Sequence, residues 1–182
     1  MNLFSEPKVA EFEILISEAL SCTKCARMCD SQKVISYANG SVASPVMFIG
    51  EAPGRLGADD TGIPFHGDRA GENFEDFLKF AGIERREIYI TNAILCNPKD
   101  ASGNNGTPSE QEVLNCSGYL KRQIDLLDPK IIVTLGATAL GALRNVEGHR
   151  LSLSTNVRTA ITWYDRTLIP LYHPGQRALL HR

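Results

Sequence analysis

The chain has 182 residues, with 43% hydrophobic and 22% charged residues and a formal net charge of −2. A chain of this length is expected to form one domain, residues 1–182, with a core of its own. The sequence has neither an apolar run long enough to span a membrane nor the basic and apolar regions of a secretory signal. It therefore predicts a cytoplasmic protein with no membrane partner.

Four short apolar runs, at 46–49, 88–90, 131–135 and 168–171, are predicted to be buried strands. Their continuous apolar character favours a parallel sheet that is covered on both faces. Helical patterns occupy 11–20, 71–81, 108–127 and 137–143, and the third helix is expected to begin at Pro108 with Thr107 as its N-cap. The alternation predicts an α/β protein, a three-layer α/β/α domain with a central four-stranded parallel sheet.

The segment 46–71 contains several candidate functional residues close together. Its strand leads directly into Gly50-Glu51-Ala52-Pro53-Gly54, and a long polar loop then reaches Phe65 before a helix begins. Open α/β sheets bind ligands at the carboxyl ends of their strands, and glycines let a backbone approach a ligand closely. We expect a binding loop here; the alternative is a connecting loop whose glycines only form turns.

Polar side chains also follow the other strands. Asn92 comes after the second strand, Gly136 after the third and His173 after the fourth. Because parallel strands end at one edge of a sheet, Glu51, Asn92 and His173 are expected to converge on one crevice. A carboxylate, an amide and an imidazole suit a nucleobase, with Phe65 as a stacking face. Taken singly, each has a structural alternative, as a strand cap, a core histidine or a core ring.

The five cysteines offer a possible metal site. Cys22 and Cys25 form a C-x2-C pair, and Cys29, Cys96 and Cys116 follow. This pairing is typical of a metal or cluster site, while structural zinc, a redox pair or unlinked buried thiols are the alternatives. Four ligand positions would leave one cysteine over, and spacing alone does not exclude Cys29.

Charge is unevenly distributed along the chain. Residues 129–182 contain seven basic and two acidic residues, about +5, whereas the remainder contains 12 basic and 19 acidic residues. A basic C-terminal third can face a polyanion such as nucleic acid; solvated surface arginines are the alternative.

Taken in order, the motifs resemble one known family. Residues 46–71, 89–96, 115–120, 133–136 and 172–174 together resemble the iron–sulfur-containing family 4 of the uracil-DNA glycosylase superfamily, over roughly residues 20–177. The resemblance implies an enzyme of base excision repair that hydrolyses the N-glycosidic bond of uracil in single- or double-stranded DNA. It also implies base flipping, an oxocarbenium-like transition state and a structural 4Fe-4S cluster. We expect a monomer.

The resemblance also assigns roles to residues. The 50–54 loop becomes the water-activating motif, with Glu51 as its acid and Asp59 or Asp60 as alternative carboxylates. Phe65 would stack on the flipped uracil, Asn92 would read its edge, and His173 would face its O2. Implied substrate contacts also include Gly50, Ala52, Pro53 and Gly54. Implied DNA contacts are Gly136, Gly175 and Arg177. Implied cluster ligands are Cys22, Cys25, Cys96 and Cys116, which leaves Cys29 spare.

The chain departs from the family pattern in four places. The second acid after G-E-A-P-G is replaced by 56–58, and Asp59 and Asp60 come later. The segment 65–71 contains His66 and Asp68 and leans toward family 5. The loop 96–116 is longer than in the family, and 175–177 differ after His-Pro. These departures leave open a same-fold glycosylase for hypoxanthine, xanthine or mismatched thymine, a non-catalytic DNA-binding module, and an iron–sulfur redox protein.

Overall fold

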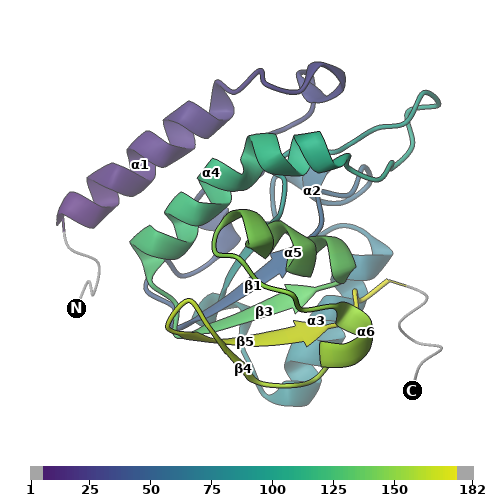
Figure 1. Ribbon diagram of the computed structural model, residues 1–182. Helices are drawn as coiled ribbons and strands as arrows, with labels where there is room; N and C mark the ends of the chain where they lie inside the picture. Colours follow the sequence, from purple (N-terminus) through teal and green to yellow (C-terminus); the bar gives the residue numbers. More distant parts are fainter. Residues whose placement is uncertain (1–5, 176–182) are drawn as a thin grey trace.

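A five-stranded sheet lies at the centre of the molecule, whose computed structural model describes residues 6–175 (Figure 1). The strand order is β2-β1-β3-β5-β4. The strands are β1 (Val46–Gly50), β2 (Tyr89–Asn92), β3 (Ile131–Leu135), β4 (Ile161–Trp163) and β5 (Arg166–Leu171). The four predicted parallel strands are all present, which confirms the α/β fold class.

The prediction of four strands was one short, because β4 pairs antiparallel with β5 at the edge of the sheet. Tyr164 and Asp165 join the two strands, with φ of 50° and 56°. Two consecutive positive φ values are the signature of a tight hairpin turn, a position that Asn-Gly or Asp-Gly usually occupies. Tyr-Asp carries no such signal in the sequence, and a three-residue strand is too short to show a period.

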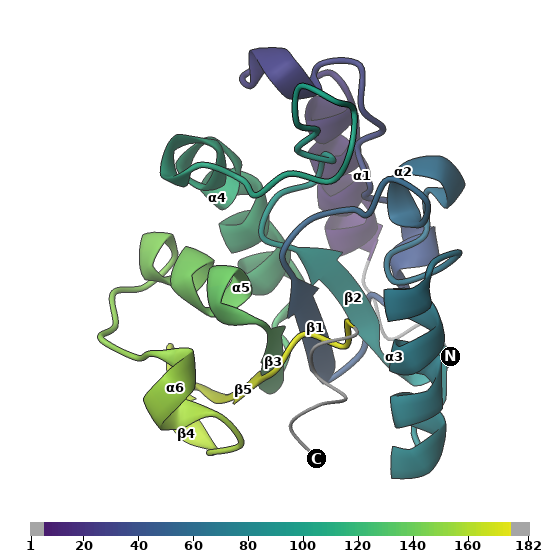
Figure 2. The same ribbon diagram turned by 90° about the vertical axis from the view of Figure 1, so that its right-hand side faces the viewer.

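Helices cover both faces of the sheet, as Figure 2 shows. On one face lie α1 (Glu6–Leu20), α4 (Glu110–Leu127) and α5 (Ala137–Ala142), and on the other lies α3 (Arg69–Ala81). The shorter elements are α2 (Ala58–Thr61), α6 (Leu153–Asn156), and the 3-10 turns Ala26–Met28, Tyr37–Asn39, Arg85–Glu87 and Leu143–Asn145. None of the helices in the described part of the chain is long and apolar enough to cross a membrane.

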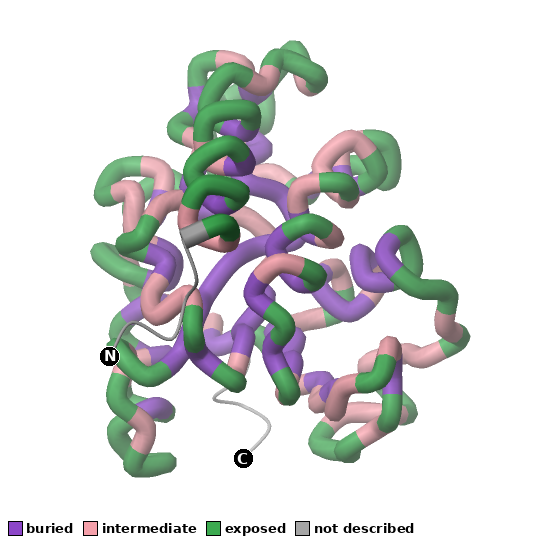
Figure 3. Tube along the Cα trace, turned by 90° about the vertical axis from the view of Figure 1, so that its left-hand side faces the viewer, coloured by how far each residue is buried: buried purple, intermediate pink, exposed green. Residues whose placement is uncertain are grey.

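Strand β1 supplies both halves of the core. Met47 and Ile49 are fully buried on the α1–α4–α5 side, whereas Phe48 points to the α3 side and packs on Phe74. Burying one such side chain contributes about 1.5–3 kcal/mol. Figure 3 shows the buried trace running through the middle of the molecule, with exposed backbone outside it. Apolar residues on both faces thus fix the sheet as the middle layer.

The start of α4 differs from the prediction by two residues. Ser109, and not Thr107, is the N-cap: its hydroxyl accepts from the Glu112 N–H, and the Glu112 carboxylate accepts from the Ser109 N–H at 2.7 Å. This reciprocal capping box satisfies two backbone donors at once, whereas a threonine followed by proline satisfies fewer. Helix α3 is likewise capped, by Asp68.

Candidate active site

The carboxyl ends of the parallel strands border a crevice of about 190 Å³. Ligand pockets for drug-sized molecules span roughly 300–1,000 Å³, so this one suits a single small ring. Its lining comes from β1, β2, the loops after them and the end of β5: Glu51, Ala52, Pro53, Gly54, Ala58, Phe65, Asp68, Ala70, Asn92, Asn97, Pro98, Asn105, Gly106 and His173. The structure thus brings together Glu51, Phe65, Asn92 and His173, as the topology argument expects.

Gly50 allows three of these parts to meet. It pairs with Asn92 in the sheet, and a Cβ added to Gly50 would lie 2.4 Å from Asn92 Oδ1 and 2.7 Å from the Phe65 ring. No side chain fits there. The absence of a side chain therefore lets the Asn92 amide and the Phe65 ring approach each other over the end of β1.

Asn92 is 2% exposed, and its Oδ1 has no hydrogen-bond partner in the described structure. A buried polar atom without a partner costs about 1–3 kcal/mol, and such atoms are uncommon in native proteins. The strand backbone and the Phe65 ring hold the amide in place despite this cost. An amide fixed in this way is suited to bind the polar edge of a ligand.

Phe65 is held in an unusual backbone conformation, with φ of 49°. Its ring lies 5.0 Å from the Phe74 ring and 5.7 Å from the His173 ring, centroid to centroid. Arg85 donates from Nη1 to the Phe65 carbonyl at 3.4 Å and from Nη2 to the Pro64 carbonyl, while it pairs with Glu75 at 2.5 Å. The guanidinium thereby fixes the turn that presents the ring to the crevice.

His173 has a defined tautomer. Its Nδ1 accepts a hydrogen bond from the Gly175 N–H at 3.1 Å, so the proton of the neutral ring sits on Nε2. Burial lowers the pKa of His173 below its usual 6.5, although Glu51 and Asp68 act in the opposite direction. The residue reaches solvent at the mouth of the crevice, but its ring is neutral at pH 7 and offers an Nε2–H donor.

Glu51 is anchored through one oxygen. Its Oε2 accepts from the Thr138 hydroxyl at 2.5 Å. Thr138 lies in the first turn of α5, which starts after Gly136 in a positive-φ conformation (φ 100°). The turn at Gly136 thus places the Thr138 hydroxyl, which follows β3, next to the Glu51 carboxylate, which follows β1.

The three aspartates that follow Glu51 in the sequence differ in their position relative to the crevice. Asp59 accepts from the Gln32 N–H at 3.0 Å and pairs with Lys99 at 3.1 Å, and neither Asp59 nor Asp60 lines the crevice. Asp68 does line it. Sequence reasoning noted Asp68 only as a departure from the family pattern. Its position just before a helical run was an N-cap signal, but nothing indicated that it faces a crevice.

Two asparagines missed by sequence reasoning form the opposite wall. Asn97 donates from Nδ2 to the Pro53 carbonyl at 2.5 Å and to Asn105 Oδ1 at 2.8 Å, and Asn105 Oδ1 also accepts from the Arg55 N–H. These bonds tie the 97–106 loop to the glycine-rich loop. The sequence showed only a polar, glycine-rich segment there.

The expected DNA-contact glycines lie beside His173. A Cβ on Gly136 would be 3.4 Å from His173 Cβ, and one on Gly175 would be 3.2 Å from His173 Nδ1. The Gly136 N–H donates to Leu171 O and the Gly175 N–H to His173, so both donors are used within the protein. Arg177, the third expected contact, lies outside the described residues.

The four expected cluster ligands line one small cavity, at the end of α1, in the loop after β2 and on α4: Cys22, Cys25, Cys96 and Cys116. Burial raises the pKa of the Cys96 thiol to about 11 and that of Cys116 to about 12. Cys29 does not line the cavity, and its Sγ donates to the Cys25 and Thr23 carbonyls.

The thiols do not close into a single-ion site: residues 6–175 contain no group of three or more His, Cys, Asp or Glu side chains placed to hold one metal ion. A four-iron cluster is larger than one ion, so its thiolates stand farther apart. Four soft thiol donors around one cavity fit such a cluster better than they fit a zinc ion.

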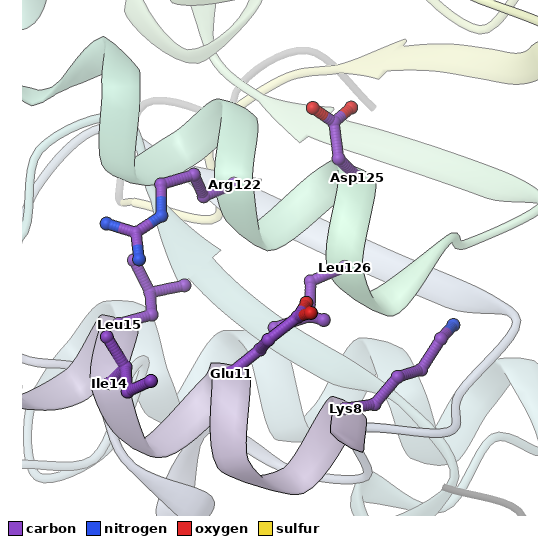
Figure 4. A pocket seen from close by; sticks show the side chains of 7 residues that line it. All are labelled: Lys8, Glu11, Ile14, Leu15, Arg122, Asp125 and Leu126. Atoms are coloured by element: carbon purple, nitrogen blue, oxygen red, sulfur yellow. The ribbon is translucent and has the colours of Figure 1, made fainter. Parts of the chain in front are cut away.

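A second groove lies between α1 and the C-terminal half of α4 (Figure 4). Its lining is Lys8, Glu11, Ile14, Leu15, Arg122, Asp125 and Leu126. Leu126 lies one loop before the start of β3, so the groove is near the amino ends of the strands. It combines aliphatic and charged side chains without an amide, imidazole or ring, and the crevice at the carboxyl ends is therefore the candidate active site.

The carboxyl edge of the sheet joins an amide, an aromatic ring, an imidazole and a carboxylate in one crevice, which is the arrangement of an enzyme active site in the α/β class. The model of the uracil DNA glycosylase superfamily matches residues 37–181. The chain therefore belongs to the uracil DNA glycosylase superfamily, and it is a glycosylase.

Relatives of two types were found. The type-4 uracil-DNA glycosylase of Thermotoga maritima is 35% identical over 164 residues, covering 90% of this chain and 81% of that protein. That of Sulfurisphaera tokodaii is 36% identical over 169 residues, with coverages of 90% and 74%. The type-5 enzyme of Pyrobaculum aerophilum is 26% identical over 165 residues, with coverages of 75% and 71%. The predicted resemblance to family 4, with weaker family 5 features, is confirmed.

Proposed function

We propose that this protein removes uracil from DNA by hydrolysing its N-glycosidic bond, as the first step of base excision repair. The observation that carries the proposal is the buried Asn92 Oδ1, which has no partner and lies beside the Phe65 ring over Gly50. Similarity to type-4 uracil-DNA glycosylases supports the choice of base.

Base recognition begins when the nucleotide leaves the stack and enters the crevice, at a cost of a few kcal/mol that pocket contacts offset. Phe65 stacks on the ring. The Asn92 amide accepts from N3–H and donates to O4 of uracil, a pattern that cytosine reverses. The small crevice and the fixed amide together select a pyrimidine with that edge.

Bond cleavage leaves negative charge on the base and positive charge on the sugar. His173, neutral with its proton on Nε2, donates a hydrogen bond to O2 as charge develops there. Glu51 faces the oxocarbenium-like sugar and orients the attacking water; we place Glu51 in this role ahead of Asp59 and Asp60 because it lines the crevice. Preorganised electrostatics of this kind commonly supply the largest catalytic term.

The DNA strand would run past the mouth of the crevice. Gly136 and Gly175 allow the backbone to come close to it, and Arg177 would contact a phosphate. We infer a single catalytic domain that acts as a monomer in the cytoplasm.

We also propose that Cys22, Cys25, Cys96 and Cys116 hold a 4Fe-4S cluster. The thiolates come from the end of α1, the loop after β2 and α4, so the bound group joins three segments. When bound, the cluster supplies a structural cross-link. Cys29 is not a ligand in this proposal, because its Sγ donates to backbone carbonyls.

A glycosylase assay tests the function. The protein is incubated with single- and double-stranded oligonucleotides that carry one uracil, hypoxanthine, xanthine or G·T mismatch, and alkali then cleaves abasic sites. We expect cleavage at uracil. Cleavage only at hypoxanthine or xanthine would support the broader-substrate alternative, and DNA binding without base release would support a non-catalytic module.

A further inference from the structure

Asn73 is a buried polar residue within α3, and it is 6% exposed. Asparagine is a weaker helix former than alanine or leucine, because its amide competes for backbone groups. Here the amide reaches another segment, and its Nδ2 donates to the Pro174 carbonyl at 2.7 Å. A carbonyl oxygen only accepts, so the NH₂ side of the amide must face Pro174. The bond ties α3 to the residue directly after His173.

The Pro174 carbonyl and the Gly175 N–H belong to one peptide group. In a planar trans peptide the C=O and the N–H point in opposite directions. The Gly175 N–H donates to His173 Nδ1 at 3.1 Å, while the Pro174 oxygen accepts from Asn73. This peptide group therefore links the Asn73 amide to the imidazole through two hydrogen bonds.

Gly175 makes an external anchor for this peptide necessary. A Cβ at position 175 would lie 3.2 Å from His173 Nδ1, which is closer than most Cβ contacts, so the absence of a side chain lets the backbone N–H approach the ring. Glycine is also the residue with the greatest backbone freedom. A bond to the carbonyl restricts rotation of the peptide, and it strengthens the N–H as a donor because linked hydrogen bonds polarise one another.

Asn73 itself is not part of the crevice wall. The next residue, Phe74, packs on the Phe65 ring, which in turn lies 5.7 Å from the His173 ring. Two consecutive residues of α3 thus support two different groups of the site, Phe74 the aromatic ring and Asn73 the turn that follows His173. Any effect of Asn73 on the reaction must act through these neighbours.

We propose that Asn73 is a positioning residue, which acts through the Pro174–Gly175 peptide to keep the proton of the neutral His173 ring on Nε2; its effect on rate rests on the proposed uracil excision. A neutral imidazole carries its proton on one of its two nitrogens. While the Gly175 N–H points at Nδ1, that nitrogen must accept, and the proton stays on Nε2. Once the peptide is free to turn, the tautomer with Nδ1–H becomes populated, and this form has no Nε2–H to donate to O2 of uracil.

Nuclear magnetic resonance of ¹⁵N-histidine-labelled protein at pH 7.5 tests the tautomer without any substrate. The chain has four histidines, and the signals missing from His173→Gln identify His173. Leucine is a better helix former than asparagine, so Asn73→Leu should keep α3, and Asn73→Asp, which keeps the shape but loses the donor, is the second variant. In both variants the His173 Nδ1 signal should move toward that of a protonated nitrogen.

The matched control is Asn39→Leu. Asn39 is 1% exposed, and its Nδ2 also donates to a backbone carbonyl, that of Ile90, at 2.7 Å. The substitution removes the same kind of buried bond at a residue that does not contact His173. It should lower the stability of the fold and leave the His173 nitrogen signals at their wild-type positions.

A double-mutant cycle tests whether Asn73 acts on the reaction through His173. The single-turnover rate of uracil excision should fall about 10-fold in Asn73→Leu, less than the about 10²- to 10³-fold that a directly lost donor costs. If the effect passes through the imidazole, Asn73→Leu should slow His173→Gln by no more than about twofold, because coupled residues are not additive.

The proposed function and this inference fail in different ways. If wild-type protein releases no uracil, the proposed function is overturned, while the nitrogen signals still test the role of Asn73. If wild-type protein excises uracil and the His173 signals do not move in Asn73→Leu and Asn73→Asp, the positioning role is overturned. Slowing by Asn73→Leu that is fully additive with His173→Gln would equally overturn it and leave Asn73 as a residue that only stabilises the fold.

Discussion

The Thr138 hydroxyl donates to Glu51 Oε2 at 2.5 Å, which links the first turn of α5 to the loop that follows β1. A hydrogen bond to a charged group contributes about 1.5–3 kcal/mol. Thr138 does not line the crevice and cannot contact the base directly. In the proposed mechanism Thr138 is therefore a positioning residue, which holds the Glu51 carboxylate at the crevice.

Replacing Thr138 by the isosteric Val should lower kcat about 10- to 100-fold, since each 1.36 kcal/mol lost in the transition state is tenfold in rate. KM should change little, because the base contacts stay intact. Thr138→Ser keeps the hydroxyl and should remain within about threefold of wild type. Steady-state kinetics on a uracil oligonucleotide measure both parameters; equal activity of the Val and Ser variants would argue against positioning by the hydroxyl.

The pH profile should report the neutral state of His173. Its pKa is lowered from 6.5 by burial, so the ring becomes protonated only at a pH below 6.5. Protonation takes up Nδ1 and breaks the hydrogen bond from the Gly175 N–H. Activity should therefore hold at neutral pH and fall on the acid side, with a midpoint under 6.5.

The control for this profile is His173→Gln, which cannot titrate in this range. It should be slower by about 10²- to 10³-fold, the cost of one lost donor to a developing anion, and its profile should lack that acid limb. An acid limb that persists unchanged in His173→Gln would assign the titration to another group.

Replacing Asn92 by an apolar residue should preserve or raise the stability of the fold and lower the rate of uracil excision. Replacing a polar atom that has no partner with an apolar group of similar shape is nearly neutral or stabilising, so Asn92→Leu should match or exceed the wild-type Tm. For a chain of this size, each kcal/mol gained raises Tm by about 2–4 °C. Uracil excision should fall at least about 100-fold, because the base edge loses both hydrogen bonds. A less stable but active Asn92→Leu would contradict both expectations.

The parts of this fold that follow from local patterns were predictable. The run at 131–135 was predicted with the bounds of β3, and the rule that parallel strands end at one edge placed Glu51, Asn92 and His173 together. The rest depends on geometry that a sequence does not encode locally. The Thr138–Glu51 bond depends on the turn at Gly136, and the place of Asp68 depends on the path of a long loop.

Iron binding should follow the cavity and not the C-x2-C spacing alone. Cys29→Ser should retain the iron content and the colour of wild type, because its Sγ faces backbone carbonyls. Cys116→Ser removes a thiol from the cavity wall and should lose most of the iron, with a lower Tm. Iron per chain, measured together with acid-labile sulfide, tests this; zinc without sulfide in the wild type would contradict the cluster.

Arg85 should control how well Phe65 stacks on a base. A Lys at position 85 presents one ammonium and cannot reach the Phe65 and Pro64 carbonyls while it pairs with Glu75. Base–aromatic stacking contributes about 1–3 kcal/mol, and a shifted ring forfeits part of it. Inhibition by free uracil measures this loss without DNA, and its inhibition constant should rise about 5- to 10-fold in Arg85→Lys.

The matched control for Arg85 is its neighbour Arg86, whose side chain is 80% exposed and pairs, among residues 6–175, with Glu84 alone. Arg86→Lys should leave uracil inhibition unchanged. If both variants weaken inhibition equally, the effect does not depend on the hydrogen bonds to the Phe65 and Pro64 carbonyls, because Arg85 makes these bonds and Arg86 does not. If neither variant weakens inhibition, packing on Phe74 is sufficient to keep Phe65 in its positive-φ conformation. The Arg85 guanidinium then contributes only to the stability of the fold.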